Sequence, residues 1–575
     1  MHDNLPSKIL PWDNFKNWIY CIIVVKFDLE LGQTFEMVYP QNTSLNEKER
    51  MNICFLSFPD SNSSTIGDTI YHFRLPIAFS HRKSFSLSLT FNKQCLPILM
   101  VNENSFYGYV FFRQVKDPSS IRGYFQKSLI ILSKYTFHNL FYYILNMMAP
   151  FYFENGVPAL ESASNDIDQW PPPKPGILYN LPFMGKIIKC RIPKGDDLLN
   201  NSHILELYQD DNFHYKDAFN TIFIPNLYEF DIYNCLCPII SQIHLLWELV
   251  LICQPILVIG TSPSICSSVV EVLISLIWPI KYAPDYRPYF TIQDQDFKRY
   301  ISSTNDNPRY YQELFAYPRS MRPSVLLGVT NPFFAKTLQH WPHIVRINPL
   351  ISPKSSKIKK SIKRASLLQP FENKTGVYTK YKTYINKDKW FLNKLNKNRP
   401  TEVKNALIRR HFTELTQSFM IPLERYIASL LPLFDDISPF KKWTDIGKFN
   451  EENFLKTIKQ NGPHLTSHLK GDWEGLYRKY FLSPNFANWC DTRVLELKRK
   501  VEIILSQKLQ DVDFHALYAY KTETEIVDVI INLRDKLKRY LKSDPTVFHK
   551  TIIFLESQIK GLIDQLPQDL QISIK

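Results

Sequence analysis

Trp18–Tyr39, WIYCIIVVKFDLELGQTFEMVY, is the stretch that decides the fold of the first part of the chain. It contains two runs rich in β-branched and aromatic residues, Ile19–Val25 and Thr34–Tyr39, separated by DLELG. Such runs favour strands, and Gly32 can take a turn conformation that other residues avoid. We therefore predict an antiparallel hairpin, followed along the chain by the polar motif FPDSNSS at Phe58–Ser64.

More strands and one long helix are predicted up to about Gly156. The strands are expected near Thr69–Leu75, Ile98–Val101, Tyr107–Val115 and Ser128–Ser133. A helix over Phe137–Phe153 follows, because its apolar residues recur with i, i+3, i+4 spacing. Those residues are Phe137, Leu140, Phe141, Ile144, Leu145 and Met148. Residues 11–156 are thus predicted to form an antiparallel sheet backed by a helix.

A proline-rich stretch separates this first module from the next. WPPPKPG at Trp170–Gly176 holds the backbone extended, and its prolines cannot donate hydrogen bonds to a sheet. We interpret residues 157–180 as a semi-rigid linker.

Residues 181–350 show the pattern of a doubly wound α/β module. A helix over Ile239–Cys253 leads to a strand at Ile256–Ile259, and Thr261 or Ser262 then caps a helix that has a proline in its first turn. The pattern repeats with a strand at Val325–Val329, a cap at Thr330 or Asn331, and a strand at Ile344–Ile347. Further strand character is predicted at Tyr289–Ile292. Two such units indicate a largely parallel sheet with right-handed crossovers.

The last part, residues 401–575, is predicted to be mainly helical. Apolar residues recur with helical spacing in three stretches. They are Leu407, Ile408, Phe412, Leu415 and Phe419; Val494, Leu497, Val501, Ile504 and Leu505; and Ile526, Ile530, Leu533, Leu537 and Tyr540.

Composition indicates a large globular protein of a reducing compartment. The chain has 575 residues, 45% hydrophobic and 22% charged, and its nine cysteines show no paired spacing. The opening residues lack a basic start followed by an apolar core, so we expect no secretory signal and a cytoplasmic location. The most apolar window, Leu236–Gly260, carries Glu248, and we expect a buried helix and strand there rather than a transmembrane span.

The positive charge is concentrated in one segment. Residues 351–400 hold fourteen Lys and Arg against Glu372 and Asp388, and we predict a basic loop or linker there. A solvated linker is one interpretation, and a patch for anionic membrane lipid is the other. Its candidate lipid-binding residues are Lys354, Lys357, Lys359, Lys360, Lys363 and Arg364. No nucleic-acid-binding motif accompanies the charge, so no nucleic-acid partner is expected.

Patterns that suggest chemistry are weak in this sequence. VIGTSPS follows a strand but lacks the spacing and lysine of a phosphate-binding loop. His464 and His468 could share a helical face, but no carboxylate base or third ligand accompanies them. Asp294-Gln295-Asp296 resembles the acidic motif with which some transferases hold a divalent ion. We expect no cofactor, no metal and no catalytic residue, and keep a metal-dependent transferase using Asp294 and Asp296 as a minor alternative.

Several long blocks resemble the DENN-domain family of Rab GTPase exchange factors and look most like its subgroup named DENN domain-containing protein six. The blocks are PWDNFKNWIYCIIVVKFDLELGQTFEMVYP, FPDSNSSTIGDTIYHFR, GYVFFRQVKDPSSIRGYFQKSLIILSKYTFHNLF, WPPPKPG, LWELVLICQPILVIGTSP and LLGVTNPFFAKTLQHWPHIVRI. The resemblance covers residues 11 to about 350 and then loosens. It implies a longin-like upstream module at 11–156, a central DENN module at 181–350 and a downstream module with a C-terminal tail at 401–575.

The resemblance also implies a function. A protein of this family promotes GDP release from a Rab GTPase and binds it preferentially in the GDP-bound or nucleotide-free state, here in endosomal recycling traffic, with recruitment from the cytoplasm to recycling endosomes. A scaffold that binds an active GTPase without exchange is the alternative. The GTPase is expected between the first two modules, where polar residues near predicted strand ends are candidate contacts. They are Arg113, Gln114, Lys116, Asp285, Tyr286, Arg287, Asp294 and Asn331.

Overall fold

The computed structural model describes most of the chain as an α/β protein with a helical C-terminal region. The described residues are 12–60, 67–77, 88–118, 123–195, 220–297, 326–334, 341–348, 374–431, 448–461, 463, 469–512, 514, 521–543 and 547–574. They fall into two compact units. Unit 1 comprises Met1–Gln417 and Leu465–Asn485, and unit 2 comprises Ser418–His464 and Phe486–Lys575.

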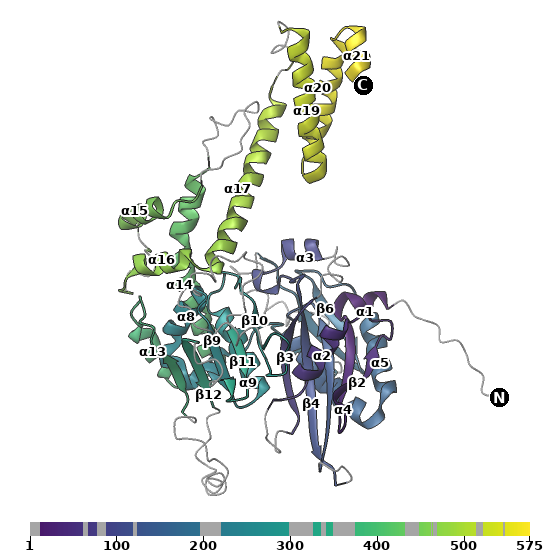
Figure 1. Cartoon of the computed structure of the whole chain (residues 1–575), viewed down its shortest axis with the longest axis vertical. Coiled ribbons are helices and arrows are strands. Elements are labelled where there is room, and N and C mark those ends of the chain that lie inside the picture. Colours follow the sequence, from purple (N-terminus) through teal and green to yellow (C-terminus); the bar gives the residue numbers. More distant parts are fainter. Residues whose placement is uncertain are drawn as a thin grey trace, which may run out of the picture. The chain divides into compact units, whose positions relative to one another are not determined.

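The predicted N-terminal hairpin is confirmed and belongs to a five-stranded antiparallel sheet (Figure 1). Its strands are β1 (Cys21–Asp28), β2 (Gly32–Tyr39), β3 (Thr69–Pro76), β4 (Ser105–Lys116) and β5 (Tyr124–Ser133), in the order β2-β1-β5-β4-β3. Gly32 has a φ of +79°, which only glycine adopts readily. The Asp28 carboxylate accepts hydrogen bonds from the amides of Glu30 and Leu31, and these bonds fix the turn.

Helices cover both faces of this first sheet. Helix α2 (Glu47–Leu56) shares an apolar core with Ile23 and Val25 on one face. Helix α4 (His138–Asn155) packs on the other face against Ile22 and Val24, with its predicted apolar stripe buried. Strand β1 is therefore buried on both sides, which explains why it reads as a continuous apolar run rather than an alternating one.

Two predictions near this sheet are wrong. Ile98–Val101 is not a strand: Pro97–Leu99 forms a 3₁₀ turn after α3 (Ser88–Gln94), because Pro97 cannot donate to a ladder. The predicted linker at 157–180 instead begins with helix α5 (Val157–Asp168) and reaches into β6 (Leu178–Phe183). Helix α5 was not predicted because the neighbouring prolines indicate extended backbone, although α5 carries an apolar stripe of its own.

Strands β6, β7 (Lys186–Arg191) and β8 (Thr221–Ile224) form a small three-stranded sheet in that order. Its apolar residues join the core of the first sheet on the α4 side. Trp170 lies in this core and donates its indole N–H to the carbonyl of Pro182 at 2.7 Å. The proline-rich stretch is thus anchored on the first module.

The second sheet contains the predicted parallel units. Its strands are β9 (Ile256–Gly260), β10 (Tyr286–Arg287), β11 (Leu326–Val329), β12 (His343–Ile347) and β13 (Gly376–Thr379). In the order β10-β11-β9-β12-β13, all neighbours are parallel except β12 and β13. The strand predicted at Tyr289–Ile292 is absent among the described residues, and the two-residue β10 precedes it. Within the predicted basic loop at 351–400, the described residues form β13 and helix α13 (Lys389–Asn396).

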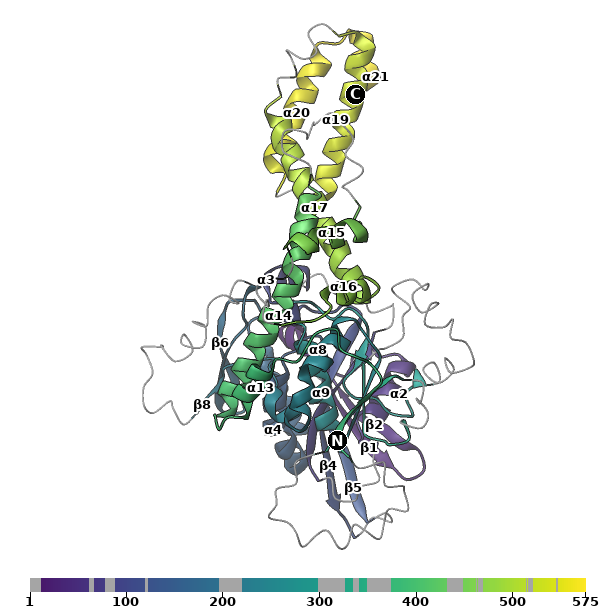
Figure 2. The ribbon, with the colours of Figure 1, turned by 90° about the vertical axis from the view of Figure 1, so that its left-hand side faces the viewer.

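Helices connect and cover the second sheet. The predicted helix at Ile239–Cys253 is split into a 3₁₀ segment, Cys237–Gln242, and α8 (Ile243–Leu251), which follow the short α7 (Ile232–Leu236). Helix α9 (Pro263–Ser275) begins as predicted: Ser262 accepts a hydrogen bond from the amide of Ile265, and Pro263 stands in the first turn. Helix α8 contacts α13 and the first half of α14 (Thr401–Ser429), which run beside it in Figure 2.

The two five-stranded sheets of unit 1 meet along the edge strand β3. Helix α9 and strand β10 pack against β3, so the outer edge of the first sheet is covered rather than open. Tyr71 and Tyr289 contact each other edge to face across this boundary, with ring centroids 5.1 Å apart. This boundary brings together residues of both predicted modules.

The rest of the chain is helical, as predicted. Its helices include α15 (Glu451–Asn461), α16 (Trp473–Phe481), α17 (Pro484–Gln510), α19 (Glu523–Ser543), α20 (His549–Asp564) and α21 (Gln568–Ile574). Within unit 2, apolar residues of α19 and α20 form a separate core around Leu555.

Candidate functional site

Asp60, in the polar motif after α2, joins the first sheet to the second. Its amide donates to the Tyr289 hydroxyl at 2.6 Å, and its carbonyl accepts from the Thr330 hydroxyl at 3.0 Å. Its carboxylate accepts from the side-chain amide of Asn331 at 3.4 Å and from the amide of Ile292 at 3.4 Å. One short loop therefore fixes two loops that follow β10 and β11.

Exposed side chains lie around this connection. Met51 on α2 is 43% exposed and Phe333 after β11 is 49% exposed. Gln295 approaches Met51, with its Nε2 4.0 Å from the sulfur, and Asn331 accepts from the amide of Phe333 at 3.0 Å. We call Met51, Asp60, Gln295, Asn331 and Phe333 the junction surface. It combines apolar and polar groups contributed by both sheets, as protein-binding surfaces do.

Beside the junction surface lies a chain of ion pairs. Arg74 on β3 bonds Asp285, and Arg287 on β10 pairs with Asp285 at 3.0 Å and with Asp296 at 2.6 Å. The Arg74 guanidinium also lies over the ring of Tyr286, 4.6 Å from its centroid. These pairs hold β10 against the edge of the first sheet.

The acidic motif Asp294-Gln295-Asp296 is part of this packing. Asp294 is 3% exposed, and burial raises the pKa of its carboxyl, against the nearby charge of Arg287. It accepts a hydrogen bond from the amide of Asp296, whose own carboxylate pairs with Arg287. A divalent ion would have to displace Arg287 and enter a buried position, so this geometry does not favour the transferase alternative.

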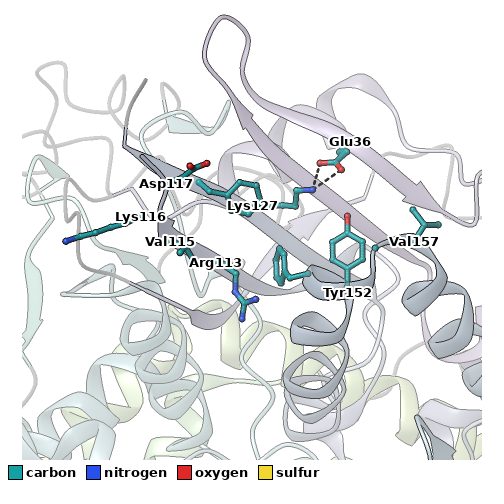
Figure 3. A pocket seen from close by; sticks show the side chains of 11 residues that line it. Glu36, Arg113, Val115, Lys116, Asp117, Lys127, Tyr152 and Val157 are labelled. Carbon is teal, nitrogen blue, oxygen red and sulfur yellow. Dashed lines mark hydrogen bonds and ion pairs between the residues drawn. The ribbon is translucent and has the colours of Figure 1, made fainter. Parts of the chain in front are cut away.

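A separate hollow of about 530 Å³ lies at the far ends of β4 and β5 (Figure 3). Arg113 pairs with Asp68 at 2.7 Å and covers the ring of Phe153, 4.5 Å from its centroid. Lys127 pairs with Glu36 at 2.8 Å. Both cations therefore already have carboxylate partners. The hollow is further lined by Val115, Lys116, Asp117, Phe125, Tyr152, Gly156 and Val157.

The predicted contact residues thus divide among three places. Arg113 and Lys116 line the hollow, and Gln114 is buried and accepts from Gln126 at 3.1 Å. Asp285, Tyr286, Arg287 and Asp294 form or adjoin the ion-pair chain, and Asn331 belongs to the junction surface. The structure does not bring them together in one place, because β10 lies at the β3 edge whereas Arg113 lies toward the other end of β4, and their role as GTPase contacts stays a prediction.

Sequence reasoning missed Asp60, Met51 and Phe333 as candidates. The polar motif FPDSNSS marks the loop that contains Asp60, but nothing in the sequence indicates which residues Asp60 contacts. The predicted lipid-binding residues, from Lys354 to Arg364, and the pair His464 and His468 lie outside the described residues.

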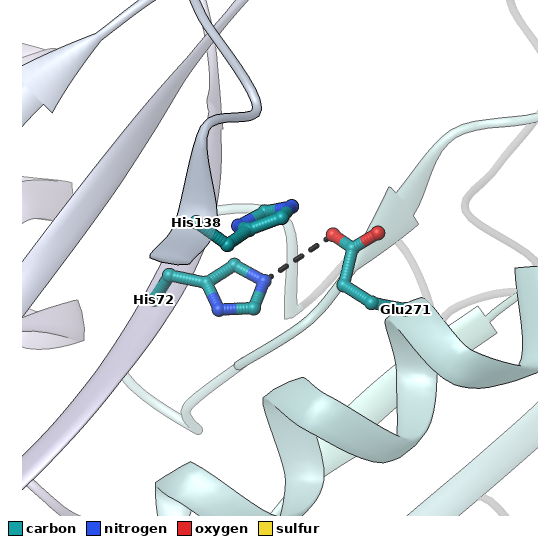
Figure 4. Close-up of side chains that lie close together, drawn as sticks. All are labelled: His72, His138 and Glu271. Carbon is teal, nitrogen blue, oxygen red and sulfur yellow. Dashed lines mark hydrogen bonds and ion pairs between the residues drawn. The ribbon is translucent and has the colours of Figure 1, made fainter. Parts of the chain in front are cut away.

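Two buried histidines and a partly buried glutamate converge between β3, α4 and α9 (Figure 4). His72, His138 and Glu271 each offer a ligand atom, and these atoms lie within 4.8 Å of one another. His72 Nε2 is 3.2 Å from Glu271 Oε1, and His72 Nδ1 is 2.6 Å from the Tyr142 hydroxyl. Burial lowers the pKa of both histidines to about 3 and raises that of Glu271. Both rings are therefore neutral at physiological pH.

The apolar run Ile232–Leu251 is long and apolar enough to cross a membrane, and more than half of it is buried inside the protein. All of α8 is buried, including Glu248. The Glu248 carboxylate accepts from the amides of Ile385 and Tyr384 and from the Tyr381 hydroxyl. In this structure most of the run packs inside the protein.

Comparisons with known proteins find extensive similarity. A family model described as the DENND6 C-terminal domain matches residues 514–575. The chain is 43% identical to Protein DENND6A of Mus musculus over 568 residues, which cover 98% of this chain and 91% of that protein. It is 40% identical to Protein DENND6B of Homo sapiens over 570 residues, covering 98% and 93%, and 34% identical to the Protein DENND6 homolog of Dictyostelium discoideum over 578 residues, covering 92% and 78%.

Proposed function

The chain belongs to the DENND6 subgroup of the DENN family, and on that premise we propose that it is a guanine nucleotide exchange factor for a Rab-family GTPase. It performs no covalent chemistry of its own. It binds the GTPase in the GDP-bound state and most tightly in the nucleotide-free state, and so promotes GDP release. This agrees with the lack of a recognisable nucleophile and base in the sequence.

The energetic demand on such a surface is modest. A GTPase holds GDP through its phosphate loop, Mg²⁺ and switch segments, and exchange requires a partner that prefers the arrangement in which these contacts are broken. A thousandfold faster release needs about 4 kcal/mol of differential binding. A protein interface of ordinary size, burying about 1,600 Å² in total, can supply that difference.

The junction surface is the observation that carries this proposal. It is formed jointly by α2, the Asp60 loop and the loop after β11, so a partner docked on it would touch both halves of unit 1. Met51 and Phe333 provide exposed apolar groups, and Gln295 and Asn331 provide polar ones. We assign the GTPase to this surface rather than to the hollow at Arg113, where Arg113 and Lys127 are already paired with carboxylates.

The finer features of the proposal follow the resemblance to the family. The first module is longin-like and the second is the central DENN module. The GTPase is one that acts in endosomal recycling, and the protein is recruited from the cytoplasm to recycling endosomes. The basic segment from Lys354 to Arg364 supports this recruitment by attraction to anionic lipid, at about 1 kcal/mol per charge near the surface.

The test is release of fluorescent GDP from a panel of Rab GTPases, with Met51→Asp and Phe333→Asp as the site variants. Each adds a charge at the centre of the proposed interface and is expected to slow catalysed release about tenfold or more, which corresponds to about 1.4 kcal/mol. Phe151→Asp, at an exposed position on α4, is the matched control and should retain full activity.

Two outcomes would change the assignment. Equal loss in all three variants would remove the junction surface as the docking site. Absence of accelerated release across the panel, together with tight binding to a GTP-loaded member, would favour the non-exchanging scaffold.

A further inference from the structure

We propose that His72, His138 and Glu271 bind a zinc ion that joins the two halves of unit 1. His72 comes from β3, His138 from the start of α4 and Glu271 from α9. The site is thus built from the edge strand of the first sheet, a helix that covers that sheet, and a helix of the second module. It is independent of the exchange activity proposed above.

The geometry suits a metal site inside the protein. Three ligand atoms within 4.8 Å of one another need only small side-chain movements to reach the separations found around a tetrahedral zinc, where bonds to nitrogen and oxygen are about 2.0–2.2 Å. His72 is fully buried and His138 is 2% exposed, while the Glu271 side chain is 11% exposed. Figure 4 shows the two rings and the carboxylate facing a common space.

Neighbouring side chains already orient the ligands. The Tyr142 hydroxyl holds His72 Nδ1, which turns the opposite nitrogen, Nε2, toward Glu271. Zinc-binding histidines are usually fixed in this way through the nitrogen that does not bind the metal. Tyr142 lies one turn after His138 on α4, and both rings lie near His72, with centroids 6.0 Å and 4.6 Å from the His72 ring. Helix α4 therefore supplies one proposed ligand, His138, and the hydroxyl that orients another, His72.

Charge also favours a cation at this place. Glu271 puts a carboxylate beside two neutral imidazole rings, and the nearby Arg74 is already bonded to Asp285. His138 Nδ1 is buried without a hydrogen-bond partner among the described residues. Two imidazoles and a carboxylate are a ligand set that zinc accepts, whereas Mg²⁺ and Ca²⁺ prefer oxygen alone. A water molecule or the second oxygen of Glu271 would complete the coordination.

The first measurement is the zinc content of the purified full chain after dialysis against zinc and then against metal-free buffer. We expect about one zinc per chain in the wild type, as for structural sites of this kind, and loss of that zinc in Glu271→Gln and in His138→Gln. His411→Gln is the matched control. His411 pairs with His244 at 3.1 Å elsewhere in unit 1, and this variant should keep the zinc.

Thermal unfolding gives a second readout. The direction in which Glu271→Gln changes the Tm shows whether Glu271 binds zinc or carries a proton. If zinc binds, Glu271→Gln lowers the Tm and a chelator lowers the Tm of the wild type but not of the variant. If Glu271 merely carries a proton, Glu271→Gln keeps the same hydrogen bonds and leaves the Tm unchanged or raised. A wild-type chain that stays free of zinc, or that keeps its zinc in Glu271→Gln, overturns the proposal. Exchange activity plays no part in either readout.

Discussion

At the scale of single residues, buried histidines make the stability of unit 1 depend on pH. His244 and His343 are each 2% exposed, and burial lowers their pKa values to about 3 and about 4. His343 is held by the Thr379 hydroxyl at 2.7 Å from its Nδ1. In the unfolded chain these rings would take up a proton near pH 6.5, whereas in the folded protein they would not.

We therefore predict a loss of stability as the pH falls from 6.5 toward 4.5. Because the unfolded state binds more protons in this window, each such histidine lowers the unfolding free energy by about 1.4 kcal/mol per pH unit. Urea unfolding of the wild type and of His343→Gln at pH 6.5, 5.5 and 4.5 checks this. Buried carboxyls such as Glu248, with raised pKa values, act in the opposite direction but equally in both proteins. The variant should therefore show the shallower pH dependence, and parallel curves would contradict the assignment to His343.

Sequence reasoning at this scale succeeded where a local signal exists. Gly32, Ser262 and Pro263 were predicted in their roles because turns and helix caps depend on neighbouring residues alone. The contact between Asp60 and Asn331 could not be predicted in this way, because 271 positions separate the two residues along the chain. Polar residues at strand ends are common, and only the packing of β10 and β11 selects those that meet.

At the scale of elements, strand β11 depends on a close approach of backbone to backbone. The amide of Phe290 donates to the carbonyl of Gly328 at 2.8 Å, and a Cβ at position 328 would overlap the carbonyl oxygen of Pro288. This contact places the segment after β10, including Tyr289, beside the second sheet.

We predict that Gly328→Ala destabilises the protein by about 1–3 kcal/mol, because the added methyl group must push this backbone away. Gly376→Ala is the control in the same sheet: its Cβ would meet only the ring of Tyr378, at an ordinary 3.9 Å. The urea midpoint of each variant measures the difference. Equal midpoints would show that the segment at Pro288 yields without cost.

Long elements with a periodic apolar pattern were predictable, whereas a very short strand and a helix next to a proline-rich stretch were not. Strands β1, β2, β4 and β9 and helix α4 follow from apolar runs or stripes that are strong enough to outweigh local preferences. Helix α5 was lost beside the prolines, and β10 has only two residues. A strand of that length is defined by its partner, β11, and carries almost no pattern of its own.

At the scale of the whole chain, each unit has its own apolar core. Leu555 is fully buried in the core of unit 2, between α19 and α20, whereas Ile553 on the same helix is 53% exposed. The family model for the C-terminal domain covers most of this core.

We predict that Leu555→Ala weakens this core by about 2–5 kcal/mol, since it removes a buried side chain and leaves a cavity. Ile553→Ala should change stability by no more than about 0.5 kcal/mol. Hydrogen exchange of the amides in α19 and α20 provides the measurement, with the amides of β9 in unit 1 as the internal reference. Unchanged exchange in Leu555→Ala would mean that the α19 and α20 core does not depend on this residue.

The two sheets and the helical C-terminal region could be predicted from the sequence, but the residues that meet where the elements pack together could not. His72, His138 and Glu271 stand far apart in the sequence and share no motif. Each looks like an ordinary core or surface residue until β3, α4 and α9 are assembled. Sites built across a boundary between modules leave no local spacing to detect.

The covered edge of β3 has a consequence for synthesis on the ribosome. Strand β3 ends at Pro76, and the helix that shields it begins at Pro263, nearly two hundred residues later. Because synthesis adds about 5–20 residues per second, the outer edge of β3 stays uncovered for roughly 10–40 s. During that interval neighbouring nascent chains could add to it, so we expect chaperones to hold the growing polypeptide until α9 has emerged.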